Sequence, residues 1–239
     1  MKQSWIIAKK ELNSYFDSLV AYILIVIFLA FTGFFTWISG NGDVFFRKQA
    51  DLNVFFQTAM WTLFFFIPAI TMRMIAEEKK TGTIELLLTK NISGLNLIMG
   101  KFLAALILVA IALGFTVVYY ISVSRLGNFD HGATLCGYLG LLLMSAAFIG
   151  IGLFASSLTN NQIVAFLLAL IIGVVFMFVF DILASTSTGW IGELFSTLSI
   201  NEHYQSISRG VIDSKDVIYF LSLAFLGVVL SEYMISKRR

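Results

Sequence analysis

Six apolar stretches, each near the length that crosses a lipid bilayer as a helix, divide this 239-residue chain. A hydrocarbon core of about 30 Å requires about 20 apolar residues in a helix. The stretches cover residues 19–38, 54–72, 102–123, 134–158, 163–180 and 217–235. Glu232 interrupts the last one near its end, where a charge beside the headgroups costs less than at the membrane centre. The pattern predicts an all-α integral membrane protein with six transmembrane helices in a single domain, residues 1–239.

The composition agrees with a chain that faces lipid. Hydrophobic residues make up 59% of the chain and charged residues 13%, whereas soluble domains average about 45–50% apolar and about 25% charged. Membrane lipid is therefore the first expected partner. The net charge of +2 gives no reason to expect nucleic acid binding. The lone Cys136 excludes an intrachain disulfide, and two distant histidines do not have metal-ligand spacing, so no metal site is expected.

The distribution of lysine and arginine predicts the orientation. An even number of spans places both termini on one side of the membrane, and basic residues accumulate on the cytoplasmic side. Eleven of the 16 basic residues fall on the side of the termini: Lys2, Lys9, Lys10, Arg73, Lys79, Lys80, Lys90, Lys101, Lys237, Arg238 and Arg239. The other side holds Arg47, Lys48, Arg125, Arg209 and Lys215. Both termini and the loop over residues 73–101 are therefore predicted to be cytoplasmic.

The segment before the first span has helical amphipathic spacing. One face holds Trp5, Ile6, Leu12, Tyr15, Phe16 and Leu19, and Lys9, Lys10, Asn13 and Asp17 lie opposite. Ser4 is suited to cap this helix. The pattern predicts an interfacial amphipathic helix. It either only anchors the first span or also forms part of a partner-binding surface, for which Trp5, Lys9, Lys10, Glu11 and Phe16 are the candidates.

The long external connection over residues 181–216 is too apolar for a plain solvated loop. Its apolar residues recur at roughly helical spacing: Trp190, Ile191, Leu194, Phe195, Leu198 and Ile200. Short re-entrant or interfacial helices are expected before the last span, with Trp190 and Tyr204 at headgroup level.

The densest charge lies in residues 73–89, RMIAEEKKTGTIELLLT. The second helix is expected to continue through Glu77 and Glu78 and to break at Gly82, which permits a positive φ. Thr83 suits an N-cap and Glu85 a first turn, ahead of an apolar face with Leu87 and Leu88. A helix this short is unstable alone in water, so it is expected to pack on a partner. Alternatively, the charges only cap the membrane and the leucines lie on lipid.

Residues 73–89, followed by Asn91-Ile92-Ser93, resemble the signature of ABC-2-type transporter permeases. Residues 8–16 (AKKELNSYF) and 198–213 (LSINEHYQSISRGVID) also resemble segments of that family, while Asn91 stands where many members have proline. Within the family the likeness is closest to permeases associated with gliding motility. The resemblance implies a permease subunit of an ATP-binding cassette exporter in the bacterial inner membrane. It also implies a second permease chain, identical or not, and an ATPase subunit that binds ATP and Mg²⁺. The implied ATPase-docking residues are Glu77, Glu78, Gly82, Thr83, Glu85, Leu87 and Leu88.

The sequence shows no pattern of catalytic or cofactor-binding residues, so no such site is expected on this chain. The stretch from Gly94 to Phe102 only approximates a P-loop, with one spacer residue too many and Phe102 in place of Ser or Thr. Pro68 in the second span is either a simple kink or a pivot above the charged loop. Two alternatives to an exporter remain. One is a membrane scaffold that recruits a partner through residues 73–93. The other is a gradient-driven carrier, which the lack of ionisable groups near a midplane disfavours.

Overall fold

The computed structural model describes residues 2–39, 44–47, 49–84 and 93–237, and these contain helices and no strands. Six helical segments are long and apolar enough to cross a membrane, which confirms the predicted fold class. They are α2 (Leu19–Trp37), α4 (Asn53–Lys80), α6 (Gly94–Phe115) with α7 (Val117–Ser124), α8 (His131–Leu158), α9 (Gln162–Val174) with η1 (Val175–Val179) and α10 (Phe180–Thr186), and α13 (Ser214–Ser236). Four shorter helices complete the described part: α1 (Lys2–Asp17), α3 (Val44–Arg47), α11 (Trp190–Ser196) and α12 (Ile200–Ser208).

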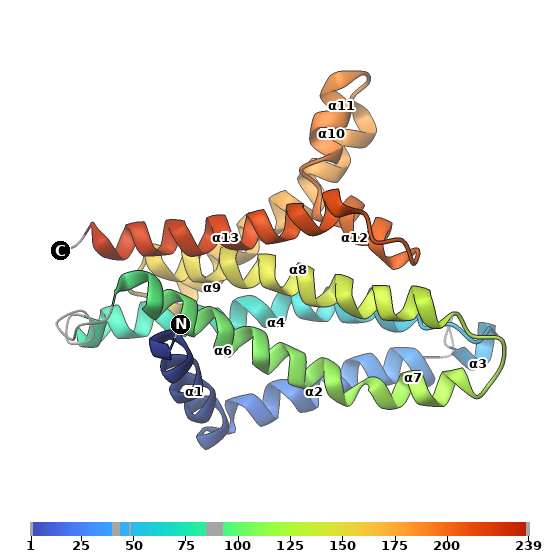
Figure 1. Cartoon of the computed structure of the whole chain (residues 1–239), viewed down its shortest axis with the longest axis horizontal. Coiled ribbons are helices and arrows are strands. Elements are labelled where there is room, and N and C mark those ends of the chain that lie inside the picture. The colour runs from blue at the N-terminus through green and yellow to red at the C-terminus, as the bar shows by residue number, and fades with distance from the viewer. Residues whose placement is uncertain (1, 40–43, 48, 85–92, 238–239) are drawn as a thin grey trace.

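The long helices run side by side, and α8 is the most enclosed of them (Figure 1). Glycines let neighbouring helices approach α8 closely. A Cβ atom placed on Gly227 of α13 would lie 2.3 Å from the carbonyl carbon of Gly150 on α8. The two backbones therefore touch directly, as small residues permit between membrane helices. Both chain ends lie toward one end of the bundle, the end at which α4 finishes (Figure 1).

Two irregularities within the spans were not predicted. The third span breaks at Thr116, whose carbonyl accepts a hydrogen bond from the Tyr138 hydroxyl at 3.0 Å and whose hydroxyl donates to the Leu113 carbonyl at 2.6 Å. These side-chain bonds compete with the regular helical ladder. The fifth span passes through the π-helical turn η1 before α10.

Helix α1 crosses the direction of the bundle and packs on α6 (Figure 1). Gly100 on α6 makes room for it, because a Cβ there would lie 2.6 Å from Ile7. The prediction that Ser4 caps this helix is wrong. The helix begins at Lys2, and the Ser4 hydroxyl instead donates to the Asn96 side-chain oxygen at 3.0 Å. Trp5, by contrast, is 58% exposed, which leaves it available to lipid.

The connection between the last two spans is helical, as its spacing indicates. Helices α10 and α11 project from the side of the bundle (Figure 1), and Phe180 stacks on Phe195 to hold them together at 6.1 Å. Helix α12 returns to pack on α8 and α13. Trp190 is exposed, whereas Tyr204 is buried against Gly140 of α8. The position of Trp190 at headgroup level stays a prediction.

Candidate functional site

A buried cluster of charges lies where the charged loop leaves the bundle. The Lys101 ammonium on α6 is 2.6 Å from a carboxylate oxygen of Glu78 on α4 and 3.2 Å from one of Glu11 on α1. The Lys101 side chain is only 1% exposed. A buried lysine must be paired to remain charged, and the two carboxylates supply that pairing. The cluster therefore ties together α1 and both helices that flank the charged loop.

Glu78 and Lys101 pair with each other inside the bundle and are not free surface charges. Glu78 was expected to offer its carboxylate to a partner protein, but one of its oxygens is held by Lys101. The other oxygen is buried and has no hydrogen-bond partner among the described residues. Lys101, which the sequence analysis only counted among the cytoplasmic basic residues, is enclosed. Sequence reasoning missed the cluster because its members are separated by 23 and 90 positions. Of the two acids, Glu77 is the one whose side chain faces outward.

A second contact fixes α1 on α4. The guanidinium of Arg73 lies over the Tyr15 ring, 4.9 Å from its centroid, in a favourable cation–π arrangement. The Tyr15 hydroxyl donates to the Ile70 carbonyl at 2.9 Å. Burial raises the pKa of Tyr15, against an opposing effect of Arg73, so the hydroxyl keeps its proton and remains a donor. Helix α1 is thus bound to the C-terminal part of α4 by both polar and aromatic contacts.

Helix α8 grips the same part of α4 through hydrogen bonds. The buried Ser156 hydroxyl accepts from the backbone N–H groups of Ile75 and Ala76, at 3.2 and 3.0 Å, and donates to the Met72 carbonyl at 3.0 Å. One turn earlier, Gly152 lies against Thr71, where a Cβ would come within 2.1 Å of the Thr71 hydroxyl. Displacement of this part of α4 must therefore move α8 or break these bonds.

The exit from α4 has the predicted form, with one correction. The helix ends at Lys80, and Gly82 follows with φ of 71°, the left-handed conformation that glycine adopts without strain. The Lys79 ammonium donates to the Ser157 carbonyl at the end of α8. Thr83 is already helical and so lies past the N-cap position predicted for it, and its hydroxyl donates to the Glu78 carbonyl at 3.4 Å.

The remaining predicted site residues fall into three groups. Lys9 and Lys10 are exposed on α1, while Glu11 and Phe16 are half-buried. Pro68 is buried inside one continuous helix, a turn before Thr71. Glu85, Leu87 and Leu88 lie outside the described residues. Between α1 and α4 a cavity of about 410 Å³ remains, lined by Lys10, Arg73 and Glu77 among others.

Residues 47–234 match the family described as ABC-2 family transporter protein. The chain belongs to the ABC-2 transporter family. No curated protein matches it. The family comprises membrane components that are generally not catalytic, with the ATPase on a separate subunit. Membership therefore implies an ABC ATPase and membrane lipid as partners. Together with the six apolar helices, the family places this chain among multi-pass membrane proteins.

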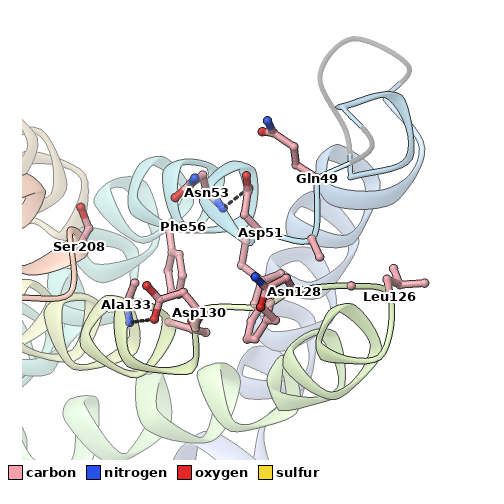
Figure 2. A pocket seen from close by; sticks show the side chains of 14 residues that line it. Gln49, Asp51, Asn53, Phe56, Leu126, Asn128, Asp130, Ala133 and Ser208 are labelled. Atoms are coloured by element: carbon pink, nitrogen blue, oxygen red, sulfur yellow. Dashed lines mark hydrogen bonds between the residues drawn. The ribbon is translucent and has the colours of Figure 1, made fainter.

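A polar cavity of about 560 Å³ lies at the starts of α4 and α8, the end of the bundle away from the Lys101 cluster (Figure 2). Its two carboxylates are used locally. Asp51 accepts from the Asn53 N–H at 3.1 Å, and Asp130 accepts from the Ala133 N–H at 2.9 Å. Both acids therefore hold the starts of α4 and α8, as aspartates before helices commonly do.

Proposed function

We propose that this chain is the permease subunit of an ATP-driven exporter in the bacterial inner membrane, with both termini in the cytoplasm. ATP and Mg²⁺ would be held by a partner ATPase, and a second permease chain would complete the pathway. Membership of the ABC-2 family supports the role. The observation that carries the coupling mechanism is the buried Lys101 cluster, which joins three helices at the base of the charged loop.

Residues 73–93 are the proposed contact with the ATPase. Glu77, Gly82, Thr83, Glu85, Leu87 and Leu88 would form the docking surface, and Glu78 would act inside the bundle as an anchor. Force on this segment would reach α1 and α6 through Lys101, and α8 through Ser156 and Lys79. ATP binding shifts the spans only if the docked ATPase binds the two membrane states with different free energies. Pro68, which lies on α4 about one turn before Met72, is the proposed pivot.

Replacement of Leu88 by aspartate tests the docking surface. A charge in an apolar contact costs several kcal/mol when it stays unpaired. We expect Leu88→Asp to insert at the normal level and to lose the copurifying ATPase. Leu126→Asp is the matched control, because Leu126 is an exposed leucine at the opposite end of the bundle. Full ATPase binding and activity with Leu88→Asp would refute the docking assignment.

Cysteine labelling tests the orientation. Ser236 and Asn128 are both exposed. Ser236 ends α13, and Asn128 lies in the connection between α7 and α8, which is at the other end of the bundle (Figure 1). In a Cys136→Ala background, an impermeant thiol reagent added to intact cells should modify Asn128→Cys and not Ser236→Cys. Labelling of Ser236→Cys alone would reverse the proposed topology.

The resemblance to gliding-motility permeases supports a narrower biological setting. We propose that the exporter serves gliding, and deletion of the gene in a gliding bacterium should stop colony spreading. Wild-type protein should restore spreading and Leu88→Asp should not. Substrate-stimulated ATP hydrolysis by the purified complex would separate the exporter from a passive scaffold, and transport without any ATPase would indicate a gradient-driven carrier.

A further inference from the structure

A cavity of about 490 Å³ lies between α4, η1 and α12, within the size range of small-molecule sites. Two helices each contribute one face to it. The lining residues are Asn53, Gln57 and Trp61 from α4, Asn201, Tyr204 and Ser208 from α12, and Arg209 directly after α12. The spacings of four residues on α4, and of three and four residues on α12, are those of a single helical face. The cavity is therefore a groove between two facing helices, and η1 forms its third wall.

Polarity changes along this groove at the level where water is expected to meet lipid. On α4, residues at every fourth position are exposed, and they run Asn53, Gln57, Trp61 and Phe65 toward the membrane interior. Two carboxamides are thus followed by two aromatic rings. Trp61 stacks on Phe178 of η1 with ring centroids 5.1 Å apart. Tryptophan favours the membrane interface, so the groove has a polar outer part and an apolar inner part.

Tyr204 supplies an unsatisfied polar group at the wall of the groove. The residue is 4% exposed, and its buried hydroxyl has no hydrogen-bond partner among the described residues. The neighbouring Asn201 side chain is engaged elsewhere, donating to Asp181 and accepting from Gln205. The ring is fixed against Gly140, where a Cβ would lie 3.2 Å from it. A buried hydroxyl without a partner is costly, so an acceptor from outside the chain would be favoured here.

Arg209 gives the groove its only charge. No carboxylate lines the cavity, and no ion pair to Arg209 occurs in the part of the chain that the structure describes. The guanidinium presents several donors in a plane and suits phosphate and carboxylate groups. Arg209 and Tyr204 are therefore both hydrogen-bond donors that favour an acceptor with negative charge.

We propose that this groove binds an anionic amphiphile. Its head group accepts hydrogen bonds from Arg209 and Tyr204, and its chain runs over Trp61 toward Phe65. A phospholipid of the outer leaflet and a single-chain amphiphilic acid share this chemistry. The site belongs to this chain alone, and binding requires neither ATP nor the ATPase, so its test is separate from that of the exporter.

Tryptophan fluorescence tests the proposal directly, because Trp61 lies inside the groove. Replacement of Trp5, Trp37 and Trp190 by phenylalanine leaves Trp61 as the only emitter. The purified full-length protein is placed in phosphatidylcholine nanodiscs that contain increasing fractions of chain-brominated phosphatidylglycerol. A parallel series adds a brominated fatty acid instead, and a third uses brominated phosphatidylcholine. Bromine quenches tryptophan at contact, so quenching reports occupancy of the groove.

We expect quenching by at least one anionic probe to saturate at a low mole fraction, well before that by brominated phosphatidylcholine. Saturation by phosphatidylglycerol identifies a membrane lipid, and saturation by the fatty acid alone identifies a single-chain amphiphile. Arg209→Gln should weaken binding of the anionic probe about tenfold, the scale of one charge-assisted hydrogen bond. It should leave the quenching by brominated phosphatidylcholine unchanged. Tyr204→Phe, which removes one oxygen atom, should weaken binding of the anionic probe several-fold.

Arg125→Gln is the matched control, since Arg125 is an exposed arginine outside this groove, and it should bind as the parent does. Equal quenching by anionic and zwitterionic probes would overturn the proposal, because Trp61 would then report only the surrounding lipid. Unchanged binding in both Arg209→Gln and Tyr204→Phe would overturn it as well.

Discussion

Replacement of Lys101 by methionine tests the buried cluster most directly. The change keeps a long side chain and removes the cation that pairs with both Glu11 and Glu78. Loss of one partner from a buried ion pair costs about 3–5 kcal/mol. The Glu11 and Glu78 side chains retain 17% and 18% exposure, so water relieves part of that cost. We therefore expect a loss at the low end, about 3 kcal/mol.

A loss of this size is measurable as thermal stability. For a chain of 150–250 residues, 1 kcal/mol shifts the unfolding midpoint by about 2–4 °C, so Lys101→Met should unfold roughly 6–12 °C below wild type in detergent. Lys80→Met is the matched control, since Lys80 is exposed at the same end of α4 and should shift the midpoint little.

A triple variant separates charge from packing. Glu11→Gln, Lys101→Met and Glu78→Gln together leave no uncompensated charge, and neutral replacement of buried ion pairs is often tolerated. Most of the lost stability should return. If Lys101→Met unfolds within 2 °C of wild type, or if the triple variant is no more stable than the single one, the cluster does not hold these helices as argued.

Three further substitutions should each lower the unfolding midpoint. Gly227→Ala places a methyl group 2.3 Å from the Gly150 backbone and should cost about 1–3 kcal/mol, whereas Gly114→Ala, with no neighbour within 4 Å, should be neutral or slightly stabilising. Ser156→Ala leaves the bonds to Met72, Ile75 and Ala76 unmade and should cost about 1–3 kcal/mol, and Ser236→Ala, at an exposed site, should not. His203→Phe should cost about 1–3 kcal/mol, the cost of leaving a buried hydrogen-bond acceptor unpaired. It strands the Asp216 carboxylate, which is 1% exposed and lies 2.7 Å from the His203 ring nitrogen. Thermal unfolding that stays unchanged in any of these variants would contradict the corresponding contact.

Length and periodicity were sufficient to predict the membrane helices and the end of α4. Each span is set by its own apolar residues, and the break at Gly82 follows from a local conformational preference. These are properties of consecutive residues, so they can be read without the fold. The burial of Lys101 cannot, because it depends on Glu11 and Glu78 arriving from two other helices. The same limit explains the error at Ser4, whose hydroxyl finds Asn96 across 92 positions.

The irregular turns were missed for a different reason. At Thr116 the helix breaks because the backbone carbonyl accepts a hydrogen bond from the hydroxyl of Tyr138 on α8. In the cavity beside α4, Arg209 comes from the connection before the last span, and only the fold places it across from Gln57 and Trp61 of the second span. The sequence does show helical-face spacings of four residues in Asn53, Gln57 and Trp61, and of three and four residues in Asn201, Tyr204 and Ser208. That signal acquires meaning only once the two helices are known to face each other.

The π-helical turn at Val175–Val179 has a consequence for how the fifth span can vary. A π turn accommodates one more residue than an α turn, so it offsets the angular phase of everything that follows by about 100°. Phe178 stacks on Trp61 and Asp181 meets Asn201 only in this phase. Removal of one residue within the turn would restore a regular helix and rotate both contacts away, although every remaining side chain would be unchanged. The outer half of this span is therefore specified by residue count as much as by residue identity, and insertions or deletions there should be tolerated less well than substitutions.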